Sequence, residues 1–223
     1  MPSKLEKFAE FDTFKNCFTL FFQNITKGFP LKGKWRAGFF NNQQPIILEL
    51  GCGKGEYTIG LAEKNPGNNY IGVDIKGNRI WFGAKQALEN GLTNVAFLRT
   101  RIDFIDHCFN EGEVDEIWIT FPDPQPQKPR AKQRLTNKIF LDRYKKFLKP
   151  GGLVHLKTDS TGFYEYTLEV IEENNLPLLW HTNNLYKNCP TNRQELVNIK
   201  TYYEKLFTEK GEDIKYVCFK LGT

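Results

Sequence analysis

The 223-residue chain lacks several features that would point to particular classes of protein. No apolar run approaches the roughly 20 residues that a membrane-spanning helix needs. The five cysteines are scattered and form no Cys-x-x-Cys pair, so neither a disulfide framework nor a cysteine metal site is expected. Residues 1–28 mix charged with apolar side chains, unlike a signal peptide. These absences favour a cytoplasmic protein with no bound metal and no membrane partner.

The composition is ordinary, but the charge is unevenly distributed. Hydrophobic residues make up 40% and charged residues 26%, which suits one α/β domain and at most a short arm. Residues 124–149 contain nine Lys or Arg and one acid, Asp142, although the whole chain carries a net charge of only +5. A basic segment on a slightly acidic body fits a polyanion site; a solvated charge run is the structural alternative.

The most informative stretch is residues 45–55, Pro-Ile-Ile-Leu-Glu-Leu-Gly-Cys-Gly-Lys-Gly. Its apolar residues predict a strand buried on both faces, and a Gly-x-Gly-x-Gly turn and a helix over 57–64 follow. This order is how an open α/β sheet cradles a nucleotide-like ligand. Dehydrogenases, methyltransferases and plain tight turns all use similar glycines, so the motif alone does not choose between them.

Two acidic residues narrow the choice of ligand. Glu49 lies in an apolar strand, where an unpaired carboxylate is costly, and a sulfonium cofactor with a free amino group would pair with it. Asp74 ends a strand over 70–73, some twenty residues past the glycine loop, where this fold places the carboxylate that binds ribose hydroxyls. Together they favour S-adenosyl-L-methionine, with S-adenosyl-L-homocysteine as product.

The rest of the chain predicts the architecture. Further strands are expected at 95–98, 116–120, 153–156, near 178 and at 215–221, with helices over 78–90, 160–173 and 200–210 and a polar loop over 182–193. We therefore expect an α/β, Rossmann-like fold, with a mostly parallel seven-stranded sheet over residues 45–223 and helices on both faces.

Residues 1–44 are expected to form an N-terminal arm without a strand. Aromatic and aliphatic residues recur at three- or four-residue steps, which predicts an amphipathic turn packed on the domain. The segment also contains Lys34, Trp35 and Arg36. An exposed Trp among basic residues would suit RNA, so a structural arm and an RNA-contacting arm are both open.

The segment after strand 116–120 faces the same edge of the sheet. It reads Phe-Pro-Asp-Pro-Gln-Pro-Gln-Lys-Pro-Arg-Ala-Lys-Gln-Arg over residues 121–134. Its alternating prolines predict an extended backbone that holds Asp123 near the cofactor loop. Lys and Arg just downstream offer phosphate contacts beside it. A surface loop with a solvated Asp is the structural alternative.

These motifs resemble those of the tRNA (guanine-N7)-methyltransferases. The resemblance rests on Phe-Pro-Asp-Pro at 121–124, Arg-Leu-Thr at 134–136, Lys-Thr-Asp at 157–159 and Thr-Tyr-Tyr-Glu at 201–204, and it covers residues from about 32 to the C-terminus. It implies a class I methyltransferase fold and methyl transfer from S-adenosylmethionine to N7 of guanine in tRNA, at position 46 of the variable loop. A monomer or a homodimer is expected.

The resemblance also implies roles for individual residues. Asp123 falls on the proposed catalytic Asp. The cofactor positions are Glu49, Gly51, Gly53, Gly55, Asp74, Arg101 and Ile102. The substrate positions are Gln127, Lys128, Arg130, Lys132, Arg134, Asp159, Thr201, Tyr203 and Glu204.

The chain departs from the family at two places. Gln125, Gln127 and Pro129 stand where the family commonly has a Trp, a Lys and an Arg, so a stacking ring and a cationic substrate contact are missing. Arg101-Ile102 replaces a usual Asp-Ala pair near the adenine, and Asp103 is a candidate substitute.

Guanine N7 carries no proton, so orientation should matter more than a strong base. We hypothesise that Asp123 or Asp159 accepts hydrogen bonds from the N1 and N2 edge of the guanine. Two other readings stay open: methylation of an exocyclic amino group of another RNA base, and an RNA-binding relative with weak catalysis. A nicotinamide dehydrogenase fits less well, because the dehydrogenase fold does not require an acidic residue at the position of Glu49.

Overall fold

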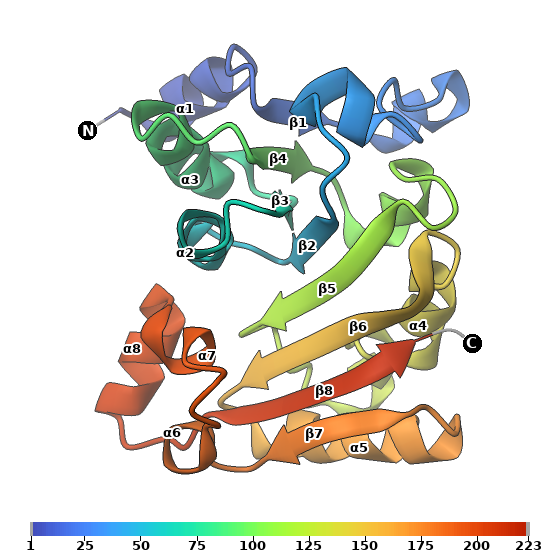
Figure 1. The fold of residues 1–223 in the computed structure, drawn as a ribbon, viewed down its shortest axis with the longest axis vertical. Coiled ribbons are helices and arrows are strands. Elements are labelled where there is room, and N and C mark those ends of the chain that lie inside the picture. The colour runs from blue at the N-terminus through green and yellow to red at the C-terminus, as the bar shows by residue number, and fades with distance from the viewer. Residues whose placement is uncertain (1, 222–223) are drawn as a thin grey trace.

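The computed structural model describes residues 2–221 and contains one eight-stranded sheet (Figure 1). The strands run in the spatial order β1-β4-β3-β2-β5-β6-β8-β7. Their bounds are β1 Cys17–Thr19, β2 Ile46–Leu50, β3 Asn69–Asp74, β4 Val95–Arg99, β5 Val114–Thr120, β6 Leu148–Thr158, β7 Leu178–Thr182 and β8 Lys215–Leu221. The seven expected strands are all present, so the predicted fold class is confirmed.

The predicted number of strands is one too low, because β1 lies in the N-terminal segment. It has only three residues and pairs in parallel with β4, with Phe18 opposite Leu98. So short a strand has no alternating pattern to reveal it, and its hydrogen bonds depend on the exposed edge of a strand that is distant in sequence.

The sheet is parallel except for β8, which runs antiparallel to both β6 and β7. The chain builds outward from β2 through β3 to β4 and then returns to β5 on the other side of β2. The connection that leaves β2 therefore runs to one side of the sheet, and the connection that enters β5 runs to the other. Such a switch point leaves a crevice at the carboxyl ends of the strands, which is where ligands bind in open α/β sheets.

Helices cover both faces of the sheet (Figure 1). The α-helices are α1 Lys4–Phe11, α2 Glu56–Lys64, α3 Gly77–Glu89, α4 Lys138–Tyr144, α5 Thr161–Glu173, α6 Leu185–Asn188, α7 Glu195–Asn198 and α8 Tyr202–Glu209. Short 3-10 helices span η1 Phe22–Lys27, η3 Ile102–His107 and η4 Lys128–Gln133, and η2 Arg36–Phe40 is a π-helix. The expected polar loop over 182–193 instead contains α6.

Two buried clusters form the core, one on each face. Ile46, Leu48 and Leu50 of β2 contribute to the cluster that also contains residues of α4 and α5, whereas Ile47 belongs to the cluster with α1, α2 and α3. Alternate side chains of β2 thus reach opposite faces, and all five of its residues are buried, as predicted for a central parallel strand.

The N-terminal segment is built into this core. Trp35 is fully buried, donates its indole N–H to the Cys108 carbonyl at 3.0 Å and stacks on Phe109. The carboxylate of Glu113 accepts the backbone N–H groups of Gly33 and Trp35. The hypothesis of an exposed Trp35 that stacks on RNA is therefore wrong. No helix within residues 2–221 is long and apolar enough to cross a membrane.

Candidate functional site

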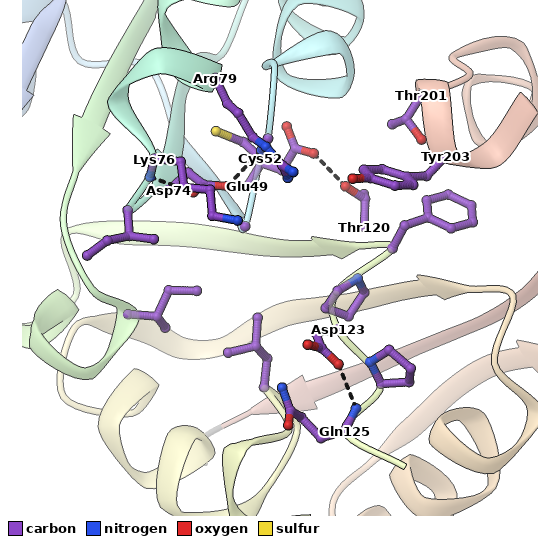
Figure 2. Close-up of a pocket in the computed structure, with 18 of the residues that line it drawn as sticks. Glu49, Cys52, Asp74, Lys76, Arg79, Thr120, Asp123, Gln125, Thr201 and Tyr203 are labelled. Atoms are coloured by element: carbon purple, nitrogen blue, oxygen red, sulfur yellow. Dashed lines mark hydrogen bonds between the residues drawn. The ribbon is translucent and has the colours of Figure 1, made fainter. Parts of the chain in front are cut away.

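A cavity of about 1280 Å³ opens at the carboxyl ends of β2, β3 and β5 (Figure 2). The topology brings these strand ends together, so segments from 49 to 207 share its wall. Of the predicted site residues, the lining contains Glu49, Gly51, Gly53, Asp74, Arg101, Ile102, Asp123, Lys132, Asp159, Thr201 and Tyr203. In the view of Figure 2, Asp74, Lys76 and Arg79 lie on one side, and Thr201 and Tyr203 on the other.

The glycine loop presents bare backbone to this cavity. Gly51 and Gly53 have φ values of 76° and 56°, which residues with a side chain rarely adopt. A Cβ at either position would meet no atom within 4 Å. A ligand can therefore approach the loop closely. Gly55 has a different role: its Cβ would lie 2.6 Å from the Phe97 ring, so this glycine is required for packing beneath the loop.

Glu49 is buried behind the loop, and the chain itself supplies hydrogen bonds to it. One carboxylate oxygen accepts the N–H of Thr58 at 2.8 Å and its hydroxyl at 2.5 Å, and the other accepts the Thr120 hydroxyl at 2.5 Å. Burial raises the pKa of Glu49 to about 7 although these hydrogen bonds lower it. The carboxylate still lines the cavity, so a cationic ligand group would favour its ionised form.

Asp74 is fixed at the end of β3 by two backbone donors. Its carboxylate accepts the N–H of Gly53 at 3.0 Å and that of Lys76 at 2.8 Å, so it ties the glycine loop to the start of α3. Beyond it, Arg101 and Ile102 line the cavity wall, and their contact with the adenine stays a prediction. Arg101 pairs with Asp103 at 3.2 Å, which brings the candidate substitute for the missing acid to the same place.

The loop that carries Asp123 is strained. Phe121 and Gln125 have φ values of 47° and 45°, a region that is costly for residues with a side chain, and for a bulky Phe especially. The Phe121 N–H donates to the Lys157 carbonyl at 2.9 Å, and the exposed Asp123 accepts the Gln125 N–H at 3.0 Å. Such strain occurs where the surrounding structure holds a functional group in place.

The basic segment after this loop is only partly as predicted. Its backbone does not stay extended: residues Lys128–Gln133 form the 3-10 helix η4. Gln127, Lys128 and Arg130 are exposed outside the cavity lining, whereas Lys132 reaches it. Their expected role as substrate contacts stays a prediction.

Arg134 differs from the other cations of this segment. Its guanidinium donates to the carbonyls of Pro124 and Gln125 at 3.1 to 3.3 Å and lies 4.4 Å from the centre of the Tyr166 ring. These contacts fix the loop of Asp123 and indicate a positioning role, while the expected contact of Arg134 with substrate stays a prediction.

The remaining predicted residues come from β6 and α8. Asp159 is partly buried at the cavity wall, and burial raises its pKa. The hydroxyl of Thr201 accepts the Glu204 N–H at 3.1 Å and caps α8. Thr201 and Tyr203 line the cavity, but Glu204 is fully buried and does not. The expectation that Glu204 contacts substrate directly is thus not supported by its position.

Glu204 instead forms a buried ion pair that the sequence reasoning missed. Lys157, at the end of β6, is also fully buried and lies 2.9 Å from both Glu204 oxygens. The Lys157 ammonium also donates to the Leu196 carbonyl, and Tyr186 donates its hydroxyl to Glu204. A lysine among the apolar residues of a strand was the available signal, because a buried ammonium needs a partner. This pair anchors α8, and hence one cavity wall, to the sheet.

Within residues 2–221, no group of three His, Cys, Asp or Glu side chains is placed to hold a metal ion. The cavity is lined by the bare glycine loop, several carboxylates, lysine and arginine side chains and a partly aromatic wall.

Comparison with known proteins agrees with this arrangement. Residues 43–217 match a family model described as a putative methyltransferase. A tRNA (guanine-N(7)-)-methyltransferase of Christiangramia forsetii is 50% identical over 220 residues, 98% of each chain. One of Porphyromonas gingivalis is 52% identical over 215 residues, 95% of this chain and 86% of the relative.

Solved structures extend the likeness in fold. The 16S rRNA methyltransferase KamB superposes with a TM-score of 0.61 at 12% identity, over 91% of this chain and 93% of that one. At this identity the likeness concerns the fold alone. The sequence relatives carry the assignment: the chain belongs to the tRNA (guanine-N(7)-)-methyltransferase family.

Proposed function

We propose that the protein transfers a methyl group from S-adenosyl-L-methionine to N7 of a guanine in tRNA, at position 46 of the variable loop. The observation that carries the proposal is the placement of Asp123 on a strained loop beside the cavity that the glycine loop opens into. The relatives' names support guanine N7 and tRNA. The position in the tRNA follows from the motif resemblance alone.

The residues present fit the cofactor. Gly51 and Gly53 leave open space for the amino-acid part of the molecule, Glu49 offers a carboxylate for its ammonium, and Asp74 offers one for ribose hydroxyls. When bound, S-adenosylmethionine supplies a methyl group activated by a positively charged sulfur. Arg101, Ile102 and Asp103 form the wall on the side of Asp74 and are proposed to contact the adenine.

The protein's own contribution is orientation. N7 of guanine has a free lone pair, so no proton must be removed before it attacks the methyl group. The Asp123 carboxylate, or that of Asp159, accepts hydrogen bonds from the N1–H and the N2 amino group and so turns N7 toward the methyl group. Adenine has no such pair of donors on that edge. A carboxylate in this place therefore selects guanine.

The decisive experiment is incubation of the protein with tritiated S-adenosylmethionine and bulk tRNA, followed by nucleoside analysis. Label in 7-methylguanosine is expected. Label in an N-methylated exocyclic amino group would support the alternative reaction, and cofactor binding without any label would support an RNA-binding relative. A tRNA transcript with adenine at position 46 tests the site, because it should take up no label. A tRNA substrate also fits the cytoplasmic location expected from the sequence.

A further inference from the structure

We infer that Tyr203 is the surface on which the target base stacks after it leaves the RNA, with Phe207 and Phe121 holding the Tyr203 ring in place. This inference rests on the proposed function and adds the missing contact to the face of the base. A carboxylate recognises only the edge of a guanine. A base taken out of its stack also needs a partner for its face.

The described cavity wall offers few rings for this purpose. Its aromatic side chains are Phe121, Phe140, Tyr202, Tyr203 and Phe207. Phe140 is only 6% exposed, whereas Tyr202 is 54% and Tyr203 39% exposed. The loop over 121–125 contains no aromatic ring besides Phe121. Phe121 and Phe207 are partly buried, so the two exposed tyrosines at the start of α8 are the candidate platforms.

Their packing separates the two tyrosines. The Tyr203 ring stacks on Phe207 with centroids 6.4 Å apart and planes at 22°, and Phe207 stacks on Phe121 at 6.2 Å and 22°. These three near-parallel rings form an aromatic ladder whose exposed end is Tyr203. Tyr202 lies outside it: its ring is at 76° to that of Tyr203, with the Lys54 ammonium 5.3 Å from its centre.

The ladder is fixed at both ends. At its partly buried end, the Phe121 N–H donates a hydrogen bond to the Lys157 carbonyl on β6, two residues before Asp123. At its exposed end, the first turn of α8 is held by the Lys157–Glu204 ion pair and by the Tyr202 N–H, which donates to Glu56 at 2.7 Å. A ring that is already immobilised loses little entropy when a base stacks on it. The ladder also links the base platform directly to the loop that carries the proposed catalytic carboxylate.

The test measures kcat/KM for tRNA in three variants. Tyr203→Leu removes the ring, Tyr203→Phe keeps it, and Tyr202→Leu removes the neighbouring ring outside the ladder. Stacking on an aromatic side chain contributes enough that its loss should lower kcat/KM for tRNA by about 5- to 150-fold in Tyr203→Leu. Tyr203→Phe keeps the ring and should stay within about threefold of the wild type, because only the hydroxyl is lost. Cofactor affinity, measured by calorimetry, should be the same in all three variants, which also shows that they are folded.

A spectroscopic measurement gives a second readout. A tRNA transcript with thienoguanosine, a fluorescent analogue that keeps the N1–H and the N2 amino group of guanine, in place of the methylated guanine should fluoresce weakly in the wild-type complex, where the base is stacked. In the Tyr203→Leu complex it should fluoresce more strongly, because the extruded base lacks a partner.

Three outcomes would overturn the inference. Tyr203→Leu could retain the wild-type kcat/KM and fluorescence, Tyr202→Leu could show the larger loss, or Tyr203→Phe could be as impaired as Tyr203→Leu. The proposed function is tested separately, by the formation of 7-methylguanosine by the unaltered protein. If that protein forms none, the proposed function itself fails.

Discussion

The Glu49 carboxylate on β2 accepts a hydrogen bond from the Thr120 hydroxyl on β5 at 2.5 Å, across the point where the sheet connections diverge. The same carboxylate accepts both donors of Thr58 at the start of α2. Strand, helix and neighbouring strand are thus joined through one buried acid at the cavity. Its protonation should affect both stability and cofactor binding.

The pH dependence follows from the pKa of Glu49. Burial raises the pKa of Glu49 from 4.5 to about 7. Between pH 4.5 and about pH 7, Glu49 is therefore protonated in the folded protein but ionised in the unfolded chain. The stability contributed by this proton is fully present below pH 4.5 and is lost as the pH rises through about 7. Binding of the cofactor ammonium should strengthen over the same rise. Calorimetry from about pH 6 to about pH 8 should show a cofactor affinity that rises with pH in the wild type, and a weak affinity that does not change with pH in Glu49→Gln. The same pH dependence of affinity in both proteins would contradict this prediction.

Asp123→Ala should lower turnover by about 100-fold or more, because the guanine would lose the group that orients it. Cofactor affinity should not change, since the hydrogen bond that Asp123 makes in the described structure is to Gln125 of its own loop. Steady-state kinetics at saturating cofactor, alongside calorimetry, would check both expectations. A loss of cofactor affinity with normal turnover would show that the assigned role is wrong.

The exposed cations of η4 should set the salt dependence. Replacing Lys128, Arg130 and Lys132 with glutamine should weaken tRNA binding at low salt and reduce the slope of log affinity against log salt by about one for each phosphate that these side chains neutralise. Filter binding between about 50 and about 200 mM salt would measure it. An unchanged slope would place the RNA backbone elsewhere, for example on the N-terminal segment.

Arg134 should behave differently from these three cations. Arg134→Gln removes the donors that hold the Pro124 and Gln125 carbonyls, so turnover should fall by about tenfold, while the salt slope changes less than in the η4 variants. Arg134→Lys is the matched variant, since it keeps the charge but not the planar fork. If Arg134→Lys restored full turnover, charge alone would explain the role of Arg134.

The Lys157–Glu204 pair predicts a pattern of stabilities. Lys157→Met should reduce the free energy of unfolding by about 3–5 kcal/mol, because it leaves the Glu204 carboxylate buried without its partner. The double variant Lys157→Met/Glu204→Leu should recover most of the loss, because an apolar pair needs no compensation. Urea unfolding measures both. A double variant as unstable as the single one would indicate that Leu196 and Tyr186 contribute more than the ion pair.

The sequence predicted the parts of the molecule that follow from local pattern. The apolar run Ile46–Leu50 and the glycines after it form the predicted strand and turn, and Ser160 does cap α5, with its hydroxyl 3.2 Å from the Phe163 N–H. Strand β1 and the burial of Trp35 depend on distant partners, which pattern does not contain. The prolines of 121–134 were poor guides beyond Gln127, because the same φ suits an extended chain and a helical turn.

The candidate site shows the same limit. Glu49, Asp74 and Asp123 could be placed at the cavity because each follows or ends a strand of a parallel sheet. Glu204 could not, because its motif indicates a helix start but not which neighbour its side chain meets. Arg134 looked like one more cation of a basic run until its carbonyl partners were known.

Lys157 makes contact in two directions at once. Its carbonyl accepts the Phe121 N–H at the start of the Asp123 loop, while its ammonium pairs with Glu204, the residue after Tyr203. One residue therefore sets the separation between the loop that would read the edge of a base and the ring that would support its face. We expect a change at Lys157 to alter base recognition through this spacing, although Lys157 itself does not line the cavity.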